Sequence, residues 1–585
     1  MSRFAIGDTD FLLDGQPHRI ISGALHYPRI HPGQWADRIA KAKQLGLNTI
    51  ETYVAWNAHE PRRGEWDTDG AHDLGRFLDL IAEAGMHAIV RPGPYICAEW
   101  HGGGLPAWLT ALPGIGLRRS EPIYLAEVER YLRQVYEIVA PRQIDRGGNV
   151  VLVQIENEYG AYGADKEYLA ELVRITRDAG ITVPLTTIDQ PQPQMLRDGS
   201  LPGLHLTGSF GSRVTERLAT LREYQPTGPL MCAEFWCGWF DWWGNLHHTT
   251  SAADSAAELD ALLAAGASVN IYMVHGGTNF GLTNGANHKG RYLPLATSYD
   301  YDAPLDEAGD PTEKYFAFRR VIARHAPVPP EAPAPAVDRP SFDVTLSSLG
   351  DWRPAVDAPR HDAPPTFEDL GHVSALVRYS AEMPKEAFDG ADTAALTVDS
   401  VRDMAWVEVD GVRVGSLSRT RHERTLPLPR GRRLDILVED QGRVNYGERI
   451  GEPKGLIGVP RVGGVALTGW AATPIDVAAV GTALTDGPAG DPLTAPAPGP
   501  VALRGEFSLD EPSDLFLRTD GWGKGYAFVN GFFLGRYWSN GPQRTLYVPG
   551  PATRPGPNVL VVLELEGAEP TARFAARADL GPVEE

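Results

Sequence analysis

The stretch Asn149–Tyr159 reads NVVLVQIENEY, an apolar run of strand length that passes into acidic and amide residues. Seven similar runs occur within the first 325 residues or so, and helical stretches lie between most of them. Strands that alternate with helices form a parallel sheet, and eight such units at this length predict a closed (β/α)8 TIM barrel. An open doubly wound sheet is the alternative, but no GxGxxG motif follows the first strand. The other predicted strands are His18–Tyr27, Thr49–Trp56, His87–Gly93, Pro184–Asp189, Leu206–Gly211, Leu230–Trp236 and Val269–His275.

Capping signals place several of the intervening helices. A long helix is predicted from about Ile123 to Ala140, because Ser120 is a candidate N-cap and Pro122 suits the first turn. The last helix of the barrel is predicted to begin near Asp310-Pro311, where a cap residue again precedes a proline. Glycines end the two earlier helices, which are predicted at Gln34–Leu45 and Leu74–Ala84.

The second half of the chain has a different, all-β character. Residues 326–340 read APVPPEAPAPAVDRP and are predicted to form a proline-rich linker after a catalytic domain at 1–325. Beyond it, VEVDGVRVG and AFVNGFFLG each place a two-residue turn between alternating apolar runs, which is typical of a β-hairpin. The repeated pattern predicts two related β-sandwiches of the jelly-roll, galactose-binding-like kind. They are placed at 341–478 and 479–585, and strands from 341–390 could belong to either.

Composition excludes several classes of function. The 585 residues carry a net charge of −21, so the chain lacks the basic surplus that non-specific nucleic-acid binding needs. No run of about 18 apolar residues occurs, so no membrane span and no membrane partner are expected. Three cysteines do not make a disulfide framework, and no zinc-site spacing is present. The N-terminus has no apolar h-region, so the cytoplasm is the default location. The sequence permits a homodimer but does not fix the oligomeric state.

The ends of the predicted strands collect carboxylates, amides and aromatic rings. Active sites of barrels form at these ends, and this mixture suits sugars, whose hydroxyls bind polar groups while aromatic rings stack on the apolar ring faces. Two carboxylates across a barrel mouth are the equipment for glycoside hydrolysis, and Glu158 and Glu234 are the candidates. Glu156 lies two residues deeper than Glu158 on the same strand face, so we expect a buried ion pair with an arginine. Spacing alone leaves ordinary ion pairs open for Glu158 and Glu234 as well.

Several motifs in this order resemble glycoside hydrolase family 35, the β-galactosidases, and in particular its bacterial members. The resemblance extends from about Phe11 to about Gly567, which is almost the whole chain. It implies a (β/α)8 barrel followed by β-sandwich domains, in agreement with the pattern of strands and helices. The motifs are YVAWNAHEP, RPGPYICAEW, GGLPAW, QIENEYG, MCAEFW, GGTNFG, SYDYDAPL, GWGKGYAFVNGFFLGRYW and GPQRTLYVPG.

The resemblance also implies roles for single residues. Glu158 matches the acid/base and Glu234 the nucleophile of a retaining double displacement, which requires no metal and no organic cofactor. Asn157 matches the residue that binds the 2-hydroxyl of the sugar. The remaining positions that match galactose-binding residues are Tyr53, Cys97, Ala98, Glu99 and Tyr301.

The acceptor side of the site is predicted from aromatic residues. Trp236, Trp239, Trp242 and Trp243 follow Glu234 closely, and we expect two of the four to wall the acceptor and two to pack the loop. Asn445-Tyr446-Gly447 resembles a segment that bacterial relatives bring near the pocket, so Tyr446 is a further candidate.

Small galactosides are the expected substrates. The compact length resembles relatives that favour β1,3-linked galactosides, so this linkage is the expected preference. A related exo-β-glycosidase, such as an exo-β-glucosaminidase, and a non-catalytic carbohydrate-binding protein are the alternatives. The presence of both carboxylates argues against the binding protein. An exo-β-glucosaminidase would need an extra acid near the 2-amino group of its substrate, and none is evident.

Overall fold

The computed structural model describes residues 3–356 and 358–583, and its first domain is a closed barrel of eight parallel strands. The strand order is β10-β11-β4-β5-β6-β7-β8-β9, and β9 pairs with β10 to close the ring. All eight strands that the sequence predicts are present, so the barrel prediction is confirmed. Their bounds are β4 Ile21–Leu25, β5 Thr49–Tyr53, β6 His87–Arg91, β7 Val150–Gln154, β8 Leu185–Asp189, β9 His205–Ser209, β10 Met231–Trp236 and β11 Ser268–His275.

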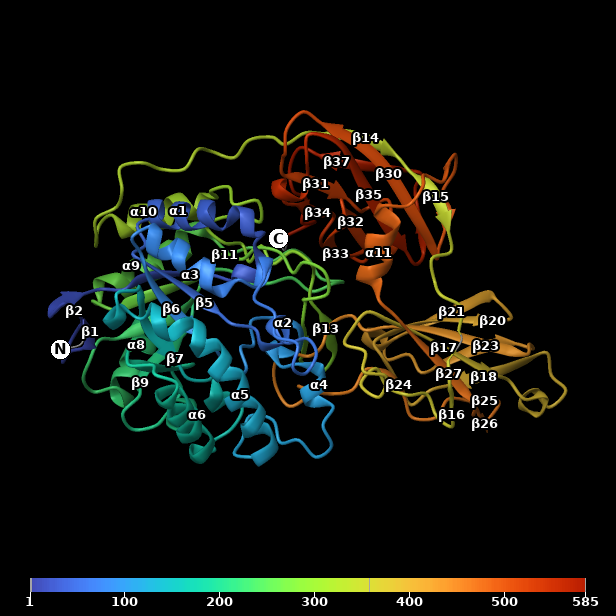
Figure 1. The fold of residues 1–585 in the computed structure, drawn as a ribbon, viewed down its shortest axis with the longest axis horizontal. Helices are drawn as coiled ribbons and strands as arrows, with labels where there is room; N and C mark the ends of the chain where they lie inside the picture. Colours follow the sequence, from blue (N-terminus) through green and yellow to red (C-terminus); the bar gives the residue numbers. More distant parts are fainter. Residues whose placement is uncertain (1–2, 357, 584–585) are drawn as a thin grey trace.

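Helices surround the barrel (Figure 1). Strands and helices share one apolar core, in which Ile50, Val90, Leu152 and Phe318 are fully or almost fully buried. At roughly 1.5–3 kcal/mol for each large apolar side chain, this core holds the strand ends in fixed positions. The helices are α1 Trp35–Leu45, α2 Trp56–His59, α3 Leu74–Glu83, α4 Ala107–Thr110, α5 Pro122–Val139, α6 Lys166–Asp178, α7 Pro193–Asp198, α8 Val214–Tyr224, α9 Ala252–Ala264 and α10 Glu313–Ile322.

Two predicted helix caps are wrong. Helix α5 is capped by Glu121, whose carboxylate accepts from the backbone N–H groups of Ile123 and Tyr124, while the hydroxyl of Ser120 donates to Asp165 instead. Helix α10 begins later than predicted, because Thr312 is its N-cap and accepts from the N–H of Tyr315. In both cases a side chain close to the expected one accepts from the free N–H groups of the first turn.

The first β-sandwich follows the barrel and the linker. A six-stranded sheet with the order β16-β27-β17-β23-β20-β21 faces a four-stranded sheet with the order β22-β18-β25-β26, and β19 pairs with β24. The strands are β16 Arg360–His361, β17 Leu376–Glu382, β18 Thr393–Thr397, β19 Ser400–Arg402, β20 Met404–Val409, β21 Val412–Ser418, β22 Thr425–Pro429, β23 Arg433–Glu439, β24 Gly455–Ile457, β25 Arg461–Val462, β26 Val465–Ala466 and β27 Trp470–Ile475.

The second β-sandwich takes its first two strands from the start of the all-β region. β14 pairs with β37, and β15 pairs with β30, so residues 342–350 lie in this sandwich and not with 360–475. Its sheets have the orders β14-β37-β31-β34 and β28-β15-β30-β35-β32-β33. The elements are β14 Phe342–Thr345, β15 Ser347–Gly350, α11 Val477–Thr485, β28 Asp491–Pro492, β29 Ala497–Pro498, β30 Val501–Leu509, β31 Leu515–Arg518, β32 Lys524–Val529, β33 Phe532–Trp538, β34 Thr545–Val548, β35 Gly556–Glu564, β36 Gly567–Ala568 and β37 Thr571–Ala575.

The two predicted hairpins are confirmed, one in each sandwich. β20 pairs with β21 across Asp410-Gly411, and β32 pairs with β33 across Asn530-Gly531. Each hairpin has a register shift close to its turn. The two sandwiches also pack against each other through an apolar cluster that includes Trp406 and Phe528.

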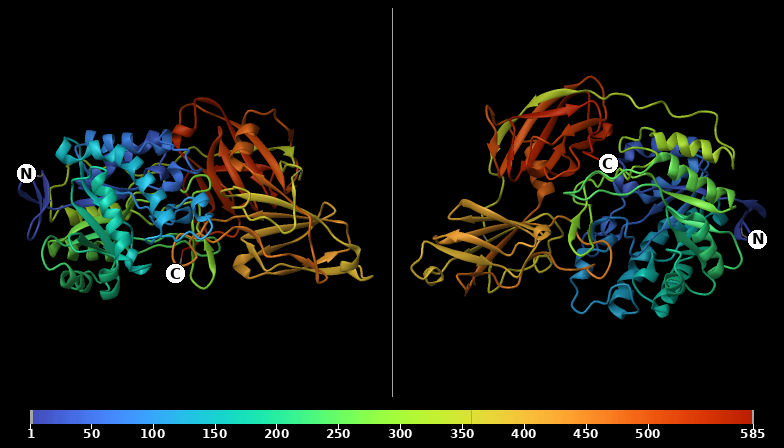
Figure 2. Two further views of the ribbon diagram at one scale, coloured as in Figure 1. Left: turned by 60° about the horizontal axis from the view of Figure 1, so that its bottom comes forward. Right: turned by 180° about the vertical axis from the view of Figure 1, so that it is seen from behind.

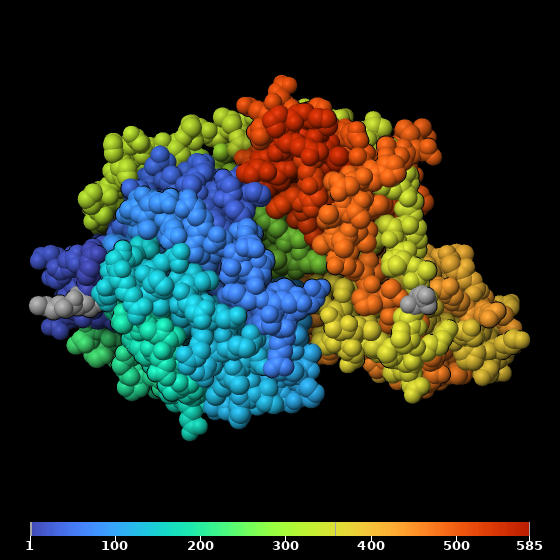
Figure 3. All heavy atoms as spheres, viewed as in Figure 1, coloured from blue at the N-terminus to red at the C-terminus, as the bar shows by residue number. Residues whose placement is uncertain are grey.

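The three domains form one contiguous body. Both sandwiches lie against one flank of the barrel, as the two further ribbon views show (Figure 2). The space-filling view shows the second sandwich, in red, beside the blue N-terminal part of the barrel (Figure 3). Residues 331–340 contain no helix or strand and cross from the barrel to β14. Within the described residues, no helix is both long enough and apolar enough to cross a bilayer.

Candidate active site

One cavity of about 270 Å³ lies at the carboxyl ends of the barrel strands. Because each of these strands brings its last residues to the same end of the barrel, side chains far apart in sequence meet there. The lining contains every site residue that the sequence predicts: Tyr53, Cys97, Ala98, Glu99, Asn157, Glu158, Glu234, Trp236, Trp239, Tyr301 and Tyr446.

Five further residues line the cavity and were missed by the sequence reasoning. Gln190 directly follows β8 and Tyr272 lies in β11, so the rule of strand ends could have found both. Phe240 lies in the loop after β10 among the tryptophans. Asn287 and Lys289 belong to the hairpin of β12 (Ala286–His288) and β13 (Tyr292–Pro294), which no barrel pattern predicts.

Glu234 lies in β10 among hydrogen-bond donors. Its Oε1 accepts from the Tyr53 hydroxyl at 2.8 Å and from the Arg91 guanidinium at 2.5 Å. Its Oε2 accepts from the indole N–H of Trp236 at 3.1 Å. The side chain is almost fully buried, and Arg91 is buried beside it. Three donors, one of them a cation, satisfy both oxygens of an ionised carboxylate.

Glu158 has the opposite environment. It follows β7 with a positive φ of 45°, and its Oε1 accepts only from the Ser209 hydroxyl, at 2.9 Å, among the contacts of the described residues. Burial and the nearby charge of Glu234 raise the pKa of Glu158 to about 7, against a smaller lowering by Ser209. A carboxyl group with such a pKa is protonated in much of the population near neutral pH and can serve as a general acid.

Asn157 lies beside Glu158 in a fixed orientation. Its Oδ1 accepts from the Tyr53 hydroxyl at 2.8 Å and from Arg91 at 2.5 Å. Arg91 also lies 3.9 Å from the centroid of the Tyr53 ring. The side-chain amide of Gln154 is a third donor to the same oxygen, at 3.3 Å. Because these donors hold the amide oxygen, the NH₂ end is the part of Asn157 that remains for a ligand.

Glu99 ends a turn of unusual backbone conformation. Cys97, Ala98 and Glu99 have φ values of 57°, 53° and 50°, a left-handed conformation that costs each non-glycine residue about 1–2 kcal/mol. Arg29 stabilises the turn by donating to the Ala98 carbonyl at 2.6 Å, and the hydroxyl of Tyr299 donates to Glu99 Oε2 at 2.5 Å. Burial raises the pKa of Glu99 to about 7 against the lowering effects of Tyr299 and Arg29.

Glu156 does not line the cavity. Arg118 donates to both of its carboxylate oxygens, at 2.9 and 2.8 Å, and Tyr168 donates to Oε1 at 3.0 Å. The expected buried ion pair is therefore confirmed. Arg118 also donates to the Asn157 carbonyl at 2.7 Å, so this pair supports the backbone next to Glu158.

The cavity has two parts that differ in exposure. The floor consists of Tyr53, Glu99, Asn157, Glu158 and Glu234, none of which is more than 9% exposed. The outer wall consists of Trp239, Lys289 and Tyr446, of which Lys289 and Tyr446 are exposed.

The four tryptophans after Glu234 have different places relative to the cavity. Trp236 and Trp239 line the cavity, whereas Trp242 and Trp243 are not among its lining residues. Trp236 also contacts the floor, because its indole N–H donates to Glu234. It therefore differs from a residue that contacts the acceptor alone, which is the role the sequence suggested. Trp239 stacks on Phe240, with ring centroids 4.7 Å apart.

Side-chain types that bind metal ions, and one of the three cysteines, lie at the cavity within the described residues. No group of three or more His, Cys, Asp or Glu side chains in 3–356 and 358–583 is arranged to hold a metal ion. The three cysteines are free and buried. Burial raises the pKa of the Cys97 thiol, so its reactive thiolate form is suppressed even though the residue lines the cavity.

Comparison with known sequences gives matches along the chain. The profile of glycosyl hydrolases family 35 matches residues 10–325, and profiles of the first all-beta domain and the galactose-binding domain of beta-galactosidase match 364–476 and 500–558. A beta-galactosidase of Bos taurus is 42% identical, with 95% of this chain and 89% of that protein covered. A beta-galactosidase of Homo sapiens is also 42% identical, with 95% of this chain and 86% of that protein covered. The beta-galactosidase-1-like protein of Mus musculus is 42% identical, with coverages of 92% and 85%.

Proposed function

This chain belongs to glycosyl hydrolases family 35, and on that premise we propose that it is a retaining exo-β-galactosidase that releases terminal β-D-galactose from short galactosides. Relatives named beta-galactosidase that cover 95% of the chain support galactose as the sugar. The observation that carries the mechanism is the contrast between two carboxyl groups in one cavity. Glu234 is surrounded by three donors, while the pKa of Glu158 is raised to about 7.

In the first step Glu234 is the nucleophile. One of its oxygens attacks the anomeric carbon as the bond to the leaving oxygen breaks, and the proton of Glu158 passes to that oxygen. The products are a free acceptor alcohol and a galactosyl ester of Glu234. Arg91 and Tyr53 orient the attacking group, because both donate to Glu234 Oε1.

In the second step Glu158 changes from acid to base. Esterification removes the negative charge of Glu234, which is one of the causes of the high pKa of Glu158, so that pKa falls and the carboxylate can take a proton from water. The water oxygen attacks the anomeric carbon from the face that the acceptor has left. Glu234 departs as a carboxylate, and β-galactose is released with its configuration retained.

The floor and the turn before it supply the sugar contacts. Asn157 offers its NH₂ group to the 2-hydroxyl, since its oxygen is already held by Tyr53 and Arg91. Glu99 accepts from ring hydroxyls, and the backbone of Cys97 and Ala98 borders the same face. Tyr301, which lines the cavity with a φ of 62°, closes the side of the sugar.

The size of the cavity supports a short substrate. Its volume of about 270 Å³ is below the roughly 300–1,000 Å³ common for sites of drug-sized ligands. We further propose that β1,3-linked galactosides are preferred, on the basis of the resemblance to compact bacterial relatives.

Hydrolysis of a panel of nitrophenyl glycosides tests the activity. We expect turnover of the β-galactoside and little or none of the β-glucosaminide or α-galactoside. Proton NMR of the first product should show the β-anomer before mutarotation. Absence of turnover on any β-glycoside would favour a binding protein, and an α-anomer would exclude double displacement. Comparison of kcat/KM for disaccharides with β1,3, β1,4 and β1,6 linkages then gives the linkage preference.

A further inference from the structure

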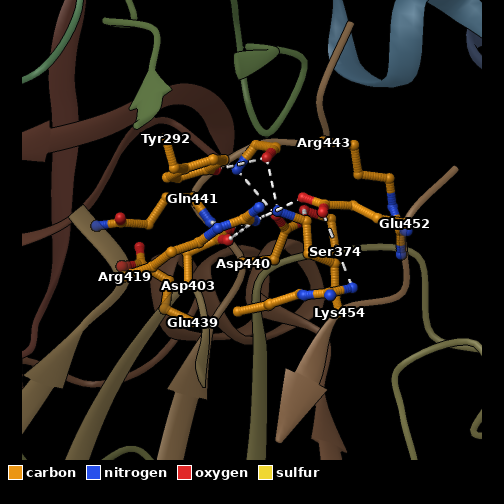
Figure 4. A network of polar contacts seen from close by, with 12 residues as sticks. Tyr292, Ser374, Asp403, Arg419, Glu439, Asp440, Gln441, Arg443, Glu452 and Lys454 are labelled. Carbon is orange, nitrogen blue, oxygen red and sulfur yellow. Dashed lines mark hydrogen bonds and ion pairs between the residues drawn. The ribbon is translucent and has the colours of Figure 1, made fainter. Parts of the chain in front are cut away.

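A buried network of charged side chains lies where the first sandwich meets the barrel (Figure 4). Lys454 is at its centre with a fully buried side chain, and the side chains of Asp403 and Asp440 beside it are also fully buried. None of these residues lines the cavity of the candidate active site. The other labelled members are Tyr292, Ser374, Arg419, Glu439, Gln441, Arg443 and Glu452.

Lys454 joins three groups of the first sandwich. Its ammonium donates to Asp403 Oδ2 at 2.5 Å and to the Gly442 carbonyl at 2.8 Å, and it lies 3.1 Å from Asp440 Oδ1. All three contacts involve one segment, residues 440–446. Asp440 and Gly442 belong to it, and Asp403 Oδ2 accepts from its Gln441 N–H at 3.1 Å. The ammonium therefore fixes the beginning of this segment.

Asp440 adds a second set of bonds at the same place. Its Oδ1 accepts from the N–H of Gly442 at 2.8 Å, and its Oδ2 accepts from the Ser374 hydroxyl at 2.8 Å. Burial alone would raise the pKa of Asp440, but the charge of Lys454, the hydrogen bond with His101 and the charge of Arg443 hold it well below its ordinary value. The carboxylate is therefore ionised over the whole working range of pH.

The barrel hairpin is attached to the same network through Tyr292. Its ring lies 4.9 Å from the Lys454 ammonium and 4.4 Å from the Arg419 guanidinium, and its hydroxyl donates to the Gly442 carbonyl at 2.6 Å. Tyr292 begins β13, whose partner strand β12 contains Asn287 of the cavity lining. One cation thus holds both the hairpin and the segment 440–446.

The segment then runs along the barrel into the cavity. The N–H of Asn445 donates to the Ala286 carbonyl at 2.9 Å, and the N–H of Ala286 donates to the Arg443 carbonyl at 3.1 Å. The side-chain amide of Asn445 donates to Asn287 Oδ1 at 3.3 Å. A Cβ on Gly442 would lie 2.6 Å from the Gly285 carbonyl oxygen, so the two backbones are in close contact. The next residue after Asn445 is Tyr446, which forms part of the outer wall.

We propose that Lys454, with Asp403 and Asp440, is a positioning residue that holds Tyr446 and the β12–β13 hairpin in place and thereby determines how tightly a sugar acceptor binds. The inference rests on the proposed function. It adds that acceptor affinity is controlled from a charge cluster outside the cavity and in another domain. The side chains of Tyr53, Asn157, Glu158 and Glu234 are held separately, because their hydrogen bonds come from barrel strand ends and their loops. The segment does reach the turn before the floor, since the side-chain amide of Asn445 donates to Cys97 Sγ at 3.6 Å.

The chemistry of the cluster favours positioning over stability alone. Desolvation of buried ions offsets most of their attraction, so a buried salt bridge by itself adds little net stability compared with apolar residues of the same size. Directional bonds to Gly442, Gln441 and Tyr292 nevertheless fix the geometry of the segment. An apolar cluster of the same volume would not specify it.

Two variants test the proposal in the full-length protein. Lys454→Met removes the ammonium and should raise KM for a galactosyl disaccharide about tenfold, while KM and kcat for nitrophenyl β-galactoside change less than twofold. Tyr292→Phe removes only the hydroxyl that donates to Gly442, and should raise the disaccharide KM about threefold, as expected for the loss of one hydrogen bond. This milder change keeps the test decisive if Lys454→Met does not fold.

A matched control separates positioning from loss of a buried charge. Arg353 forms a buried ion pair with Glu408 of the first sandwich at 2.7 Å, and neither residue contacts 440–446 through any bond of the described residues. Arg353→Met should therefore leave both KM values unchanged. In the background of Tyr446→Ala, adding Tyr292→Phe should raise the disaccharide KM by less than it does in the wild type, because part of the effect of the hydroxyl passes through Tyr446.

Hydrogen exchange followed by mass spectrometry gives a readout that needs no substrate. Peptides covering 440–447 should exchange faster in Lys454→Met and Tyr292→Phe, while the barrel-strand peptides of these variants and the 440–447 peptides of Arg353→Met match the wild type. If those peptides are unchanged, or if both substrates are affected equally, positioning by Lys454 is wrong. Failure of the wild type to hydrolyse any galactoside would instead overturn the proposed function, and exchange would still decide the positioning role.

Discussion

The floor and the outer wall of the cavity are built in different ways. Floor residues come from barrel strand ends and the loops after them and are at most 9% exposed, and two of them, Asn157 and Glu234, share the donors Tyr53 and Arg91. The outer wall combines a loop, a hairpin tip and Tyr446 of another domain, which is 37% exposed. A rigid floor suits catalysis, because the reacting groups need a fixed geometry. A wall assembled from several segments can vary, and with it the acceptor that binds, without displacing the catalytic groups.

This contrast predicts two kinds of failure on mutation. Changes in the floor should lower kcat for every substrate, because the reacting groups are lost or misplaced. Changes in the wall should raise KM only for substrates that have a sugar acceptor. The predictions below test this division from the largest expected effect to the smallest.

Glu234→Gln should have the largest effect. The amide keeps the volume of the side chain but cannot form the galactosyl ester, so kcat should fall on the order of 10³-fold or more. Thermal unfolding should show an intact fold, and azide should not restore a β-galactosyl product. Retention of more than about a tenth of the wild-type rate on purified protein would show that Glu234 is not the nucleophile.

Glu158→Ala should damage the enzyme according to the leaving group. Alkyl and sugar leaving groups need a proton in the first step, so kcat/KM for substrates that carry them should fall about 10²–10³-fold. For activated nitrophenyl galactosides kcat/KM should fall much less. The galactosyl-enzyme should then accumulate, and azide should release it as β-galactosyl azide. Equal loss for all leaving groups without an azide effect would assign the acid/base to another residue.

The pH profile should carry the signature of Glu158. Its carboxyl group is protonated below a pKa of about 7 and ionised above it. Since the first step needs the protonated form, kcat/KM for poor leaving groups should fall about tenfold per pH unit above pH 7. Glu158→Ala should lack this decline. A decline of equal size in the variant would trace it to a different group.

Wall variants should have the smallest and most selective effect. Trp239→Ala and Tyr446→Ala should each raise KM for disaccharides about three- to tenfold, the size expected for one aromatic contact, and leave nitrophenyl galactoside almost unaffected. Trp236→Ala serves as the contrast, because its indole also donates to Glu234, so it should lower kcat for both substrates. Uniform changes in KM for all three variants would remove the distinction between floor and wall.

Sequence predicted the floor well because its residues follow strands that have a strong pattern of their own. Glu158 and Glu234 come from the ends of two such runs. The strand alternation assumed for Asn149–Tyr159 predicted that Glu156 lies outside the cavity, as it does, but β7 ends at Gln154, and Glu156 and Glu158 follow it with positive φ values of 56° and 45°. Arg91 was part of a quoted motif but received no role, since a buried arginine at a strand end has no periodic signal. Its partners Glu234 and Asn157 become evident only in three dimensions.

The wall and the domain contacts were harder to predict because they depend on long-range pairing. Strand β14 lies next to the linker in sequence yet pairs with β37 near the other end of the chain, which no local pattern reveals. Lys454 and Tyr292 are separated by more than one domain boundary, so their contact needed the assembled structure. Tyr446 was anticipated only through a family resemblance, and the fold accounts for its place in the cavity.

Trapping the covalent intermediate tests the central claim most directly. The enzyme should be inactivated by an activated 2-deoxy-2-fluoro-β-galactoside, because the fluorine slows both formation and hydrolysis of the ester while the activated leaving group keeps its formation fast. After digestion, tandem mass spectrometry should find the sugar on Glu234 with one label per chain. Label on Glu158 or any other carboxylate, or inactivation without a covalent adduct, would contradict the assignment of Glu234 as the nucleophile of a double displacement.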